Sequence, residues 1–555
     1  MLNIYIGCCG VFILLVYLLL TRTVLRSQNV LFKIILTLIL ALITVTRIYR
    51  LDSLQGLDLD EAMGGINAWA LAYYGVDFHL ISNPVYLYAW GSGMNILYPF
   101  LTIPVIKILG LTVIAYRLPM ALLSILSAFL FATSLMHTRF KNREVIIYLV
   151  IIFLSPGMII PSRWAVESNI FPTLLSFIVS FFILSVYSNS LIKKKIYYWI
   201  MIFTISVSAY AYSNNWLFLL TFSLVFFWWE YRKRFLTIRR VLLSIVIFVI
   251  VDWPLIAFIY VNYVSHKQIK ILGLTIVELA ESRGNSQFVF QNGHSIFISI
   301  CNNVIETFNI IFLGYDGLLK NALPGIGLFY PLMITFFIIG IIYFLENHNN
   351  LIDQFMFIML ISNLFTVMII TPNFTHLNAM TLPILYFESK GVSKTFTSSI
   401  SIGIFTVIFS MLFIFFSYRY INTYHEQLIN GDHETPLELQ QMIRNISPKK
   451  HHIYLVTGDA TYSGLYTVVL FARPISPYKF VSETPAIKPT AFTPYTTFGS
   501  YSFSQEMPKK VNDDSAVFVV KNTVNISDFM KKHKNYQLHS GKYYSYIAKK
   551  SFEEK

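Results

Sequence analysis

Three acidic residues stand close together in one short stretch of the sequence. Asp58, Asp60 and Glu61 lie within residues 56–62, flanked by apolar and small residues. Carboxylates in such surroundings are costly unless they are solvated, paired or used in a reaction. A carboxylate can act as a general base that takes the proton of an attacking hydroxyl. From the pattern alone, a solvated loop at a membrane surface explains the same residues equally well.

Two arginines provide the opposite charge. Arg117 precedes a Leu-Pro pair, and Arg163 stands four residues before Glu167. A guanidinium group is well shaped for bidentate contact with a phosphate. The structural alternatives are an Arg117 side chain that reaches lipid headgroups and an Arg163–Glu167 pair on one face of a helix.

Three further polar residues could contact a substrate. His79 lies in a stretch rich in glycine and aromatic residues, and His376 and Asn378 lie between two apolar segments near the end of the apolar part of the chain. For His79, a histidine exposed at the surface is the commoner outcome.

The composition indicates which elements must position these residues. The 555 residues are 55% hydrophobic and only 13% charged, with a mean hydropathy of +0.60. Soluble domains contain about 45–50% apolar and about 25% charged residues. The net charge is +14, and the basic residues lie between the apolar runs. This pattern indicates membrane topology and no nucleic-acid partner. Cys8, Cys9 and Cys301 form neither a disulfide framework nor a metal-ligand spacing.

The apolar runs predict a polytopic α-helical membrane protein. The N-terminal run lacks a small-residue cleavage site, so we expect a retained helix rather than a cleaved signal. About twelve spans are predicted, near residues 2–20, 34–48, 116–137, 144–161, 168–189, 196–212, 216–230, 241–262, 326–345, 351–371, 376–388 and 398–418.

The basic residues predict the orientation, because short cytoplasmic loops are enriched in Lys and Arg. Alternate loops carry several basic residues, whereas the short loops around residues 213–215 and 371–376 carry none. The basic loops are therefore predicted to be cytoplasmic. The residues on that side are Arg22, Arg26, Lys33, Arg139, Lys141, Arg143, Lys193, Lys194, Lys195, Arg232, Lys233, Arg234, Arg239, Arg240, Lys390 and Lys394.

This topology places three long segments outside the cell. They are residues 50–116, residues 262–325 and the C-terminal part from residue 421 to 555, which follows a membrane domain of residues 1–420. Within the first, residues 95–109 are apolar but short and contain Pro99, Pro104 and Lys107, so we predict a helix on the outer membrane surface. The C-terminal part has a helix-like stretch at residues 436–444 and strand-like stretches at 452–456 and 516–520, which predict a small α/β domain.

Taken together, these motifs resemble the GT-C superfamily of membrane glycosyltransferases, especially the protein O-mannosyltransferase and aminoarabinose-transferase branch (glycosyltransferase family 39-like). The resemblance covers most of residues 34–420. It rests on the order, spacing and shared outer position of short motifs. They are Asp60-Glu61-Ala62, the Pro-containing helix from Tyr98 to Leu109, Gly110, Arg117-Leu118-Pro119, residues 163–167 and residues 373–383. The sequence has Asn83-Pro84-Val85 where the mannosyltransferases have His-Pro-Pro, which argues against a protein acceptor.

The resemblance implies a polyprenyl-phosphate sugar donor and transfer to an acceptor hydroxyl, usually with inversion at the anomeric carbon. By position in the motifs, Asp60 would be the base, and Glu61 would orient it or hold an acceptor hydroxyl. Arg117 and Arg163 would bind the donor phosphate. Asp58, His79, Glu167, His376 and Asn378 are possible substrate contacts. A divalent metal near Asp58, Asp60 and Glu61 is possible but not required by any ligand spacing.

Other functions remain open from the sequence. A secondary transporter would have a similar number of spans, although no internal repeat or clear midplane site is visible. A polysaccharide polymerase or ligase, or a catalytically silent scaffold, would also fit the membrane pattern. Richness in Ile, Phe, Tyr, Asn and Lys suggests a Gram-positive bacterium, whose plasma membrane would hold the protein. We therefore expect a cell-envelope glycopolymer as the acceptor, with the active site and the C-terminal domain outside the cell.

Overall fold

A computed structural model describes residues 28–53, 56–91, 93–280, 288, 295–314, 316–431, 434–484, 495–509, 511, 515–550 and 552. The chain forms two compact units, and each is described by itself. The first unit comprises Met1–Leu51, Arg117–Trp253 and Gly284–Tyr424. The second comprises Asp52–Tyr116, Pro254–Arg283 and His425–Lys555. The predicted span at residues 2–20, with Cys8 and Cys9, lies outside the described residues.

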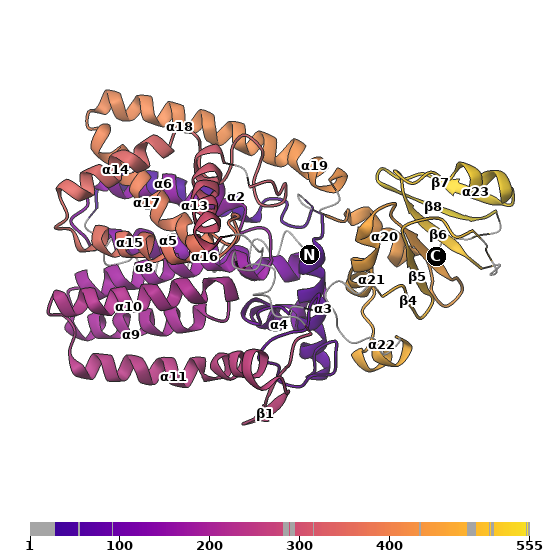
Figure 1. The fold of residues 1–555 in the computed structure, drawn as a ribbon. Coiled ribbons are helices and arrows are strands. Elements are labelled where there is room, and N and C mark those ends of the chain that lie inside the picture. Colours follow the sequence, from indigo (N-terminus) through magenta and orange to yellow (C-terminus); the bar gives the residue numbers. More distant parts are fainter. Residues whose placement is uncertain are drawn as a thin grey trace. The chain divides into compact units, whose positions relative to one another are not determined.

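The first unit is built from helices (Figure 1). Helices α5 and α11 begin or end in the second unit, and the others lie within the first. They are α2 (Val30–Ile48), α5 (Val113–Met136), α6 (Asn142–Phe153), α7 (Pro156–Ile159), α8 (Phe171–Tyr187), α9 (Leu191–Ser208), α10 (Trp216–Arg232), α11 (Ile238–Tyr260), α13 (Ile296–Leu313), α14 (Ile334–Glu346), α15 (Leu351–Ser362), α16 (Leu364–Ile369), α17 (Asn378–Thr395) and α18 (Ser399–Arg419).

The helices confirm a polytopic membrane protein. Among the described residues, seven helical stretches are long and apolar enough to cross a bilayer. They are Val30–Ile48, Val113–Met136, Glu167–Tyr187, Ile238–Ser265, Ile296–Leu313, Leu351–Ile369 and Ser399–Asn430. Other predicted spans coincide with shorter or more polar helices, such as α9 and α14. The number of twelve spans therefore stays a prediction.

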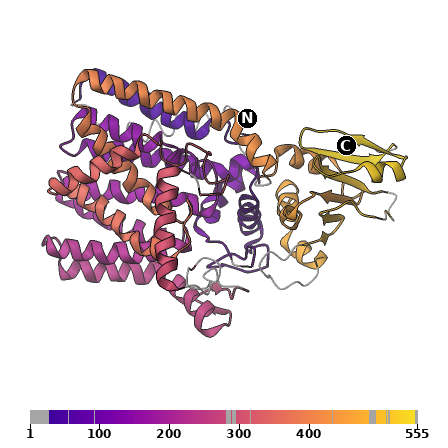
Figure 2. The ribbon, with the colours of Figure 1, turned by 45° about the horizontal axis from the view of Figure 1, so that its top comes forward.

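Helix α13 was not foreseen in the sequence, where its residues were assigned to the second outer segment. Most of its apolar surface is exposed, with Phe297 75% and Ile298 55% accessible. In both views α13 runs across the common direction of α9, α10 and α18 (Figures 1 and 2). A helix along a membrane surface would have this direction relative to spanning helices.

Two glycines bring α14 and α17 into backbone contact. A Cβ atom added to Gly340 would lie 2.0 Å from the carbonyl oxygen of Phe387, and one added to Gly391 would lie 1.9 Å from that of Phe336. Small residues allow this close approach between membrane helices, where packing rather than hydrophobicity drives association. Helix α17 is thereby enclosed, and nearly all of its residues are buried.

Lys390, which the sequence assigned to a cytoplasmic loop, is instead buried within α17. Its ammonium group pairs with the carboxylate of Asp353 on α15, which also accepts a hydrogen bond from the hydroxyl of Tyr386 at 2.7 Å. A buried charge needs such a partner because desolvation is expensive. The predicted cytoplasmic loop therefore contains fewer basic residues than the sequence suggested.

The second unit combines the first predicted outer segment with the C-terminal region. It contains α3 (Leu59–Tyr74), α4 (Leu97–Leu109), the short hairpin of β1 (Ile269–Ile271) and β2 (Leu274–Ile276), and α19 (His425–Asn430). Helix α4 occupies the place of the predicted Pro-containing surface helix, and Pro104 lies inside it. The remaining helices are α20 (Leu437–Asn445), α21 (Leu465–Ala472), α22 (Pro477–Glu483) and α23 (Ser527–Lys532).

The C-terminal region has the mixed α/β character that the sequence predicted. Its six strands lie in the order β4-β5-β3-β6-β8-β7. Strand β3 (Ile453–Val456) is parallel to β5 (Tyr501–Ser504) and to β6 (Val517–Lys521). The outer strands β4 (Thr497–Phe498), β7 (Tyr536–His539) and β8 (Tyr544–Lys549) pair antiparallel. Both predicted strands thus form the centre of the sheet, where apolar residues are buried.

Candidate functional site

The acidic cluster lies at the start of helix α3, and two of its members cap that helix. The carboxylate of Asp58 accepts the backbone N–H of Asp60 at 2.7 Å, and Glu61 accepts the N–H of Asp58 at 3.3 Å. This reciprocal arrangement is a capping box, which satisfies donors that a helix start leaves unpaired. Asp58 and Glu61 are both buried.

Asp60 differs from its two neighbours because it is only partly buried. One carboxylate oxygen accepts the indole N–H of Trp90 at 2.6 Å. Trp90 has a left-handed backbone with φ of 51°, which is rare for a residue with a side chain. Its ring also meets Tyr466 edge-on, with ring centroids 6.3 Å apart. The structure therefore separates one oriented carboxylate from two that maintain the helix.

The C-terminal region buttresses this segment from within the same unit. Leu57 and Thr435 exchange two backbone hydrogen bonds, of 2.7 and 2.9 Å. Gly65 of α3 packs so closely on Phe471 of α21 that an added Cβ atom would lie 2.6 Å from its ring. Asp60 is consequently positioned by residues almost 400 positions later in the chain.

His79 belongs to a second polar group in the same unit. Asp77 is buried and accepts the N–H groups of His79 and Ile81, each at 2.8 Å. Burial raises the pKa of Asp77 to about 6 and lowers the pKa of His79 to about 4. The His79 ring lies against Tyr88, and burial, with Asp77 and Glu278, raises the pKa of Tyr88 to about 12. His79 is thus neutral at pH 7 and held within the protein.

The predicted phosphate-binding arginines both lie in the first unit, at the end of helix α2. Arg163 donates to the carbonyl oxygens of Thr46 at 2.8 Å and Tyr49 at 2.7 Å, and Arg117 donates to that of Leu51 at 3.1 Å. Cations are favourable there because the C-terminus of a helix carries partial negative charge. Arg163 thus stabilises the end of α2, and Arg117 stabilises the turn that follows it.

Two further arginines join them, and sequence analysis missed both as functional candidates. Arg47 and Arg50 lie near enough to Arg163 to interact with it electrostatically. Burial lowers the pKa of Arg163, Tyr420 opposes this, and Arg117 and Arg50 lower it further. The signal was available in the sequence, since Arg47 lies in an apolar span, where a charge is rare and often functional. Four positive charges in one place suit an anionic ligand.

The remaining candidates, Glu167, His376 and Asn378, also lie in the first unit. Asn378 donates to the carbonyl oxygen of Ser168 at 2.9 Å and accepts from the side chain of Asn215 at 2.9 Å. This contact brings Asn378 beside the residue that follows Glu167. His376 is buried, and its Nδ1 lies 2.6 Å from the carbonyl oxygen of Thr371. Arg163 lies outside the short helix that begins at Glu167, so the two do not form the helical pair considered above.

The candidate residues therefore fall into two groups. Asp58, Asp60, Glu61 and His79 belong to the second unit. Arg117, Arg163, Glu167, His376 and Asn378 belong to the first. Within the described residues, no group of three or more His, Cys, Asp or Glu side chains is arranged to hold a metal ion. Because Asp58 and Glu61 cap a helix, the acidic cluster does not fit a metal site well.

Comparison with known proteins finds a solved structure with a similar fold. No family model matches the chain, and no curated protein matches it. The crystal structure of ArnT from Cupriavidus metallidurans bound to undecaprenyl phosphate is similar over 92% of this chain and 97% of that chain, with a TM-score of 0.53 and 12% identity. The chain shares the fold of ArnT. The resemblance to GT-C membrane glycosyltransferases is thus confirmed for the fold.

Two other structures are similar at lower scores. ArnT in the apo state matches with a TM-score of 0.45, 12% identity and the same coverage. The archaeal oligosaccharyltransferase AglB from Archaeoglobus fulgidus, in complex with an inhibitory peptide and a dolichol-phosphate, matches with a TM-score of 0.48 and 11% identity. That match covers 80% of this chain and 64% of AglB.

Proposed function

We propose that this protein is a membrane glycosyltransferase that moves a sugar from a polyprenyl-phosphate donor to an acceptor outside the cell. The observation that carries the proposal is the fold shared with ArnT over nearly the whole chain, since that structure holds undecaprenyl phosphate. A partly buried, oriented carboxylate and a cluster of arginines are the two kinds of group that such a transfer requires.

In this proposal Asp60 is the general base. It takes the proton of the acceptor hydroxyl while the acceptor oxygen bonds to the anomeric carbon. The bond from that carbon to the phosphate oxygen breaks on the opposite face, which inverts the configuration. Asp60 suits this role because one of its oxygens is held by Trp90 and the residue is accessible in part. Asp58 and Glu61 keep the start of α3 in place.

The arginine cluster would stabilise the departing polyprenyl phosphate. Arg47, Arg50, Arg117 and Arg163 supply the charge, and the buried Nε–H of Arg163 has no hydrogen-bond partner among the residues that the structure describes. Charge-assisted hydrogen bonds from guanidinium to phosphate are among the strong ones in proteins. Two of these arginines also hold the end of α2 and the turn that follows it, so substitution would affect both the fold and the transfer.

The proposal also assigns the domains, the orientation, the acceptor and further residues of the substrate site. The membrane domain spans residues 1–420, and residues 421–555 form an outer domain that supports the acidic segment. The basic loops face the cytoplasm of a bacterial cell, and the acceptor is a cell-envelope glycopolymer. His79, Glu167, His376 and Asn378 line or support the substrate site.

The test is the composition of envelope glycans in cells that carry the wild type, a deletion, Asp60→Asn or Asp58→Ser, with membrane levels checked. We expect the deletion and Asp60→Asn to remove the same sugar and Asp58→Ser to keep it, because serine can still cap α3. An unchanged glycan profile in the deletion strain would contradict the proposal. Loss of the sugar in Asp58→Ser but not in Asp60→Asn would contradict the assignment of the base.

A further inference from the structure

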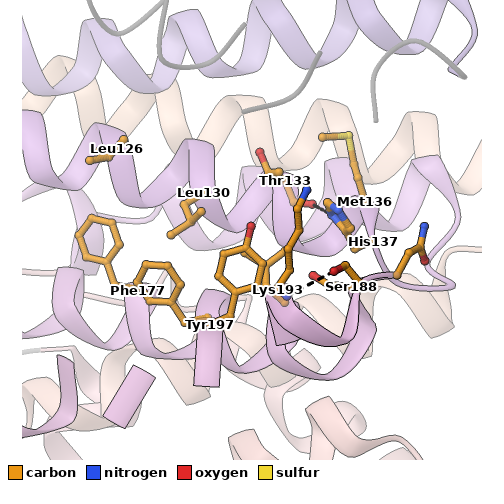
Figure 3. Close-up of a pocket in the computed structure, with 13 residues that line it drawn as sticks. Leu126, Leu130, Thr133, Met136, His137, Phe177, Ser188, Lys193 and Tyr197 are labelled. Atoms are coloured by element: carbon orange, nitrogen blue, oxygen red, sulfur yellow. Dashed lines mark hydrogen bonds between the residues drawn. The ribbon is translucent and has the colours of Figure 1, made fainter. Parts of the chain in front are cut away.

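The first unit contains a cavity of about 750 Å³ that the proposed transfer does not use. It lies between α5, α8 and α9, at the ends of these helices that the basic loops predict to be cytoplasmic (Figure 3). Cavities that hold small molecules are of this size. Its residues divide into a polar mouth and an apolar interior.

Lys193 and His137 stand at the mouth, and lysine supplies the positive charge. His137 follows the end of α5, and its Nδ1 lies 2.9 Å from the carbonyl oxygen of Thr133. A carbonyl only accepts, so this contact requires a proton on Nδ1. In Figure 3 the side chain of Lys193 extends from α9 toward Thr133 and His137. Ser188 and Asn189 add neutral hydrogen-bonding groups.

The charge at this mouth has one sign. Lys193 and His137 are among the lining residues, and the described lining contains no Asp or Glu. The complementary ligand group is therefore an anion, which lysine binds as a point charge. Farther in, the walls are Leu126, Leu130, Phe177 and Leu184, so the ligand must also carry an apolar portion.

The depth of the cavity indicates which amphiphile fits. At about 1.5 Å per residue, the part of α5 from Leu126 to Met136 measures roughly 15 Å. This is half of a hydrocarbon core of about 30 Å, or one leaflet. A phospholipid acyl chain has that reach, whereas a polyprenyl chain extends well beyond one leaflet. Arg117, in the candidate phosphate site, lies about 28 Å away along the same helix.

We propose that this cavity binds an anionic phospholipid of the cytoplasmic leaflet, with its phosphate at Lys193 and His137. The site is separate from the donor site, and it anchors the α5–α8–α9 end of the first unit to negatively charged lipid. Each basic side chain near a membrane surface contributes about 1 kcal/mol to the attraction of anionic lipid. We therefore expect about a fivefold preference over a zwitterionic lipid from Lys193.

The experiment is native mass spectrometry of the full-length protein in detergent, titrated with dioleoylphosphatidylglycerol or dioleoylphosphatidylcholine. The wild type is expected to bind phosphatidylglycerol at least fivefold better. The variant Lys193→Ala with His137→Gln is expected to lose that preference. Lys195→Ala is the matched control, because it removes the same charge from α9 but does not line the cavity.

Three results would overturn the proposal. The first is equal binding of the two lipids by the wild type, and the second is an equal loss in Lys195→Ala. The third is displacement of phosphatidylglycerol by an equal concentration of undecaprenyl phosphate, which would assign the cavity to the polyprenyl lipid. If the double variant does not fold, Leu126→Trp fills the apolar part, and we expect it to lower the binding of phosphatidylglycerol.

Discussion

Trp90 donates its indole N–H to the carboxylate of Asp60 at 2.6 Å. The tryptophan can make this contact because its backbone adopts a left-handed conformation and its ring rests against Tyr466. The hydrogen bond fixes one oxygen of the partly buried carboxylate, and in the proposed reaction the other oxygen faces the acceptor hydroxyl. Asp60 is thereby held by a loop and by the C-terminal region of the same unit.

Replacing Trp90 with phenylalanine keeps an aromatic ring and removes the N–H donor. We expect kcat to fall about 10- to 100-fold, because a hydrogen bond to a charged group is worth about 1.5–3 kcal/mol. The thermal unfolding temperature should change little. Trp69→Phe on α3 is the matched control, and equal activity loss in both variants would contradict the role of Trp90.

The helix-capping role of Asp58 predicts a stability effect without a catalytic one. Asp58→Ala should lower the free energy of unfolding of the second unit by about 1 kcal/mol, because the cap is lost. Asp58→Ser should restore most of it. Thermal unfolding in detergent measures both. If activity falls in Asp58→Ser as far as in Asp60→Asn, Asp58 takes part in the chemistry.

Asp77 and His79 should give opposite dependences of stability on pH. The pKa of Asp77 is raised to about 6 in the folded protein. The contribution of Asp77 to the free energy of unfolding therefore falls as pH rises from about 4 to 6. The pKa of His79 is lowered to about 4, so the unfolded chain binds the extra proton and stability rises from about pH 4 to 6.5. In the wild type the two contributions largely cancel.

Substitution of one residue should therefore reveal the pH dependence of stability that the other residue causes. Asp77→Asn is expected to unfold at increasingly higher temperature as pH rises from 4 to 6.5, and His79→Gln is expected to show the reverse trend between pH 4 and 6. Melting curves at closely spaced pH values measure this. Identical pH profiles for the two variants would show that these groups are not buried as described.

The buried pair of Asp353 and Lys390 makes a prediction about the first unit. Asp353→Leu or Lys390→Met alone should destabilise the protein by about 3–5 kcal/mol, since one buried charge loses its partner. The double variant should recover much of that loss. Thermal unfolding of the four proteins forms a double-mutant cycle, and additive effects would mean that the two residues do not interact.

The sequence predicted the parts of the fold that depend on local patterns. Apolar runs gave the principal membrane helices, and alternating residues gave β3 and β6 at the centre of the C-terminal sheet. The burial of Lys390 escaped prediction because its partner on α15 lies 37 positions away. Local hydropathy carries no information about such pairs.

The residue types of the candidate site could be read from the sequence, but their contacts could not. The spacing of Asp58 and Glu61 is that of a capping box, yet the sequence alone did not show that these two carboxylates cap α3 while Asp60 contacts Trp90. The contact of Trp90 with Asp60 could not be predicted from the sequence, because it depends on a loop conformation. The contacts of Arg163 with carbonyl groups more than 100 positions earlier depend on tertiary structure in the same way.

The most direct test of the central claim is the pool of lipid-linked sugars in membranes of the native host, measured by mass spectrometry. We predict that a polyprenyl-phosphate sugar accumulates several-fold in the deletion strain and in Asp60→Asn cells. It should return to the normal level with the wild type or Asp58→Ser. An unchanged pool of every polyprenyl-phosphate sugar in all four strains would contradict transfer from such a donor.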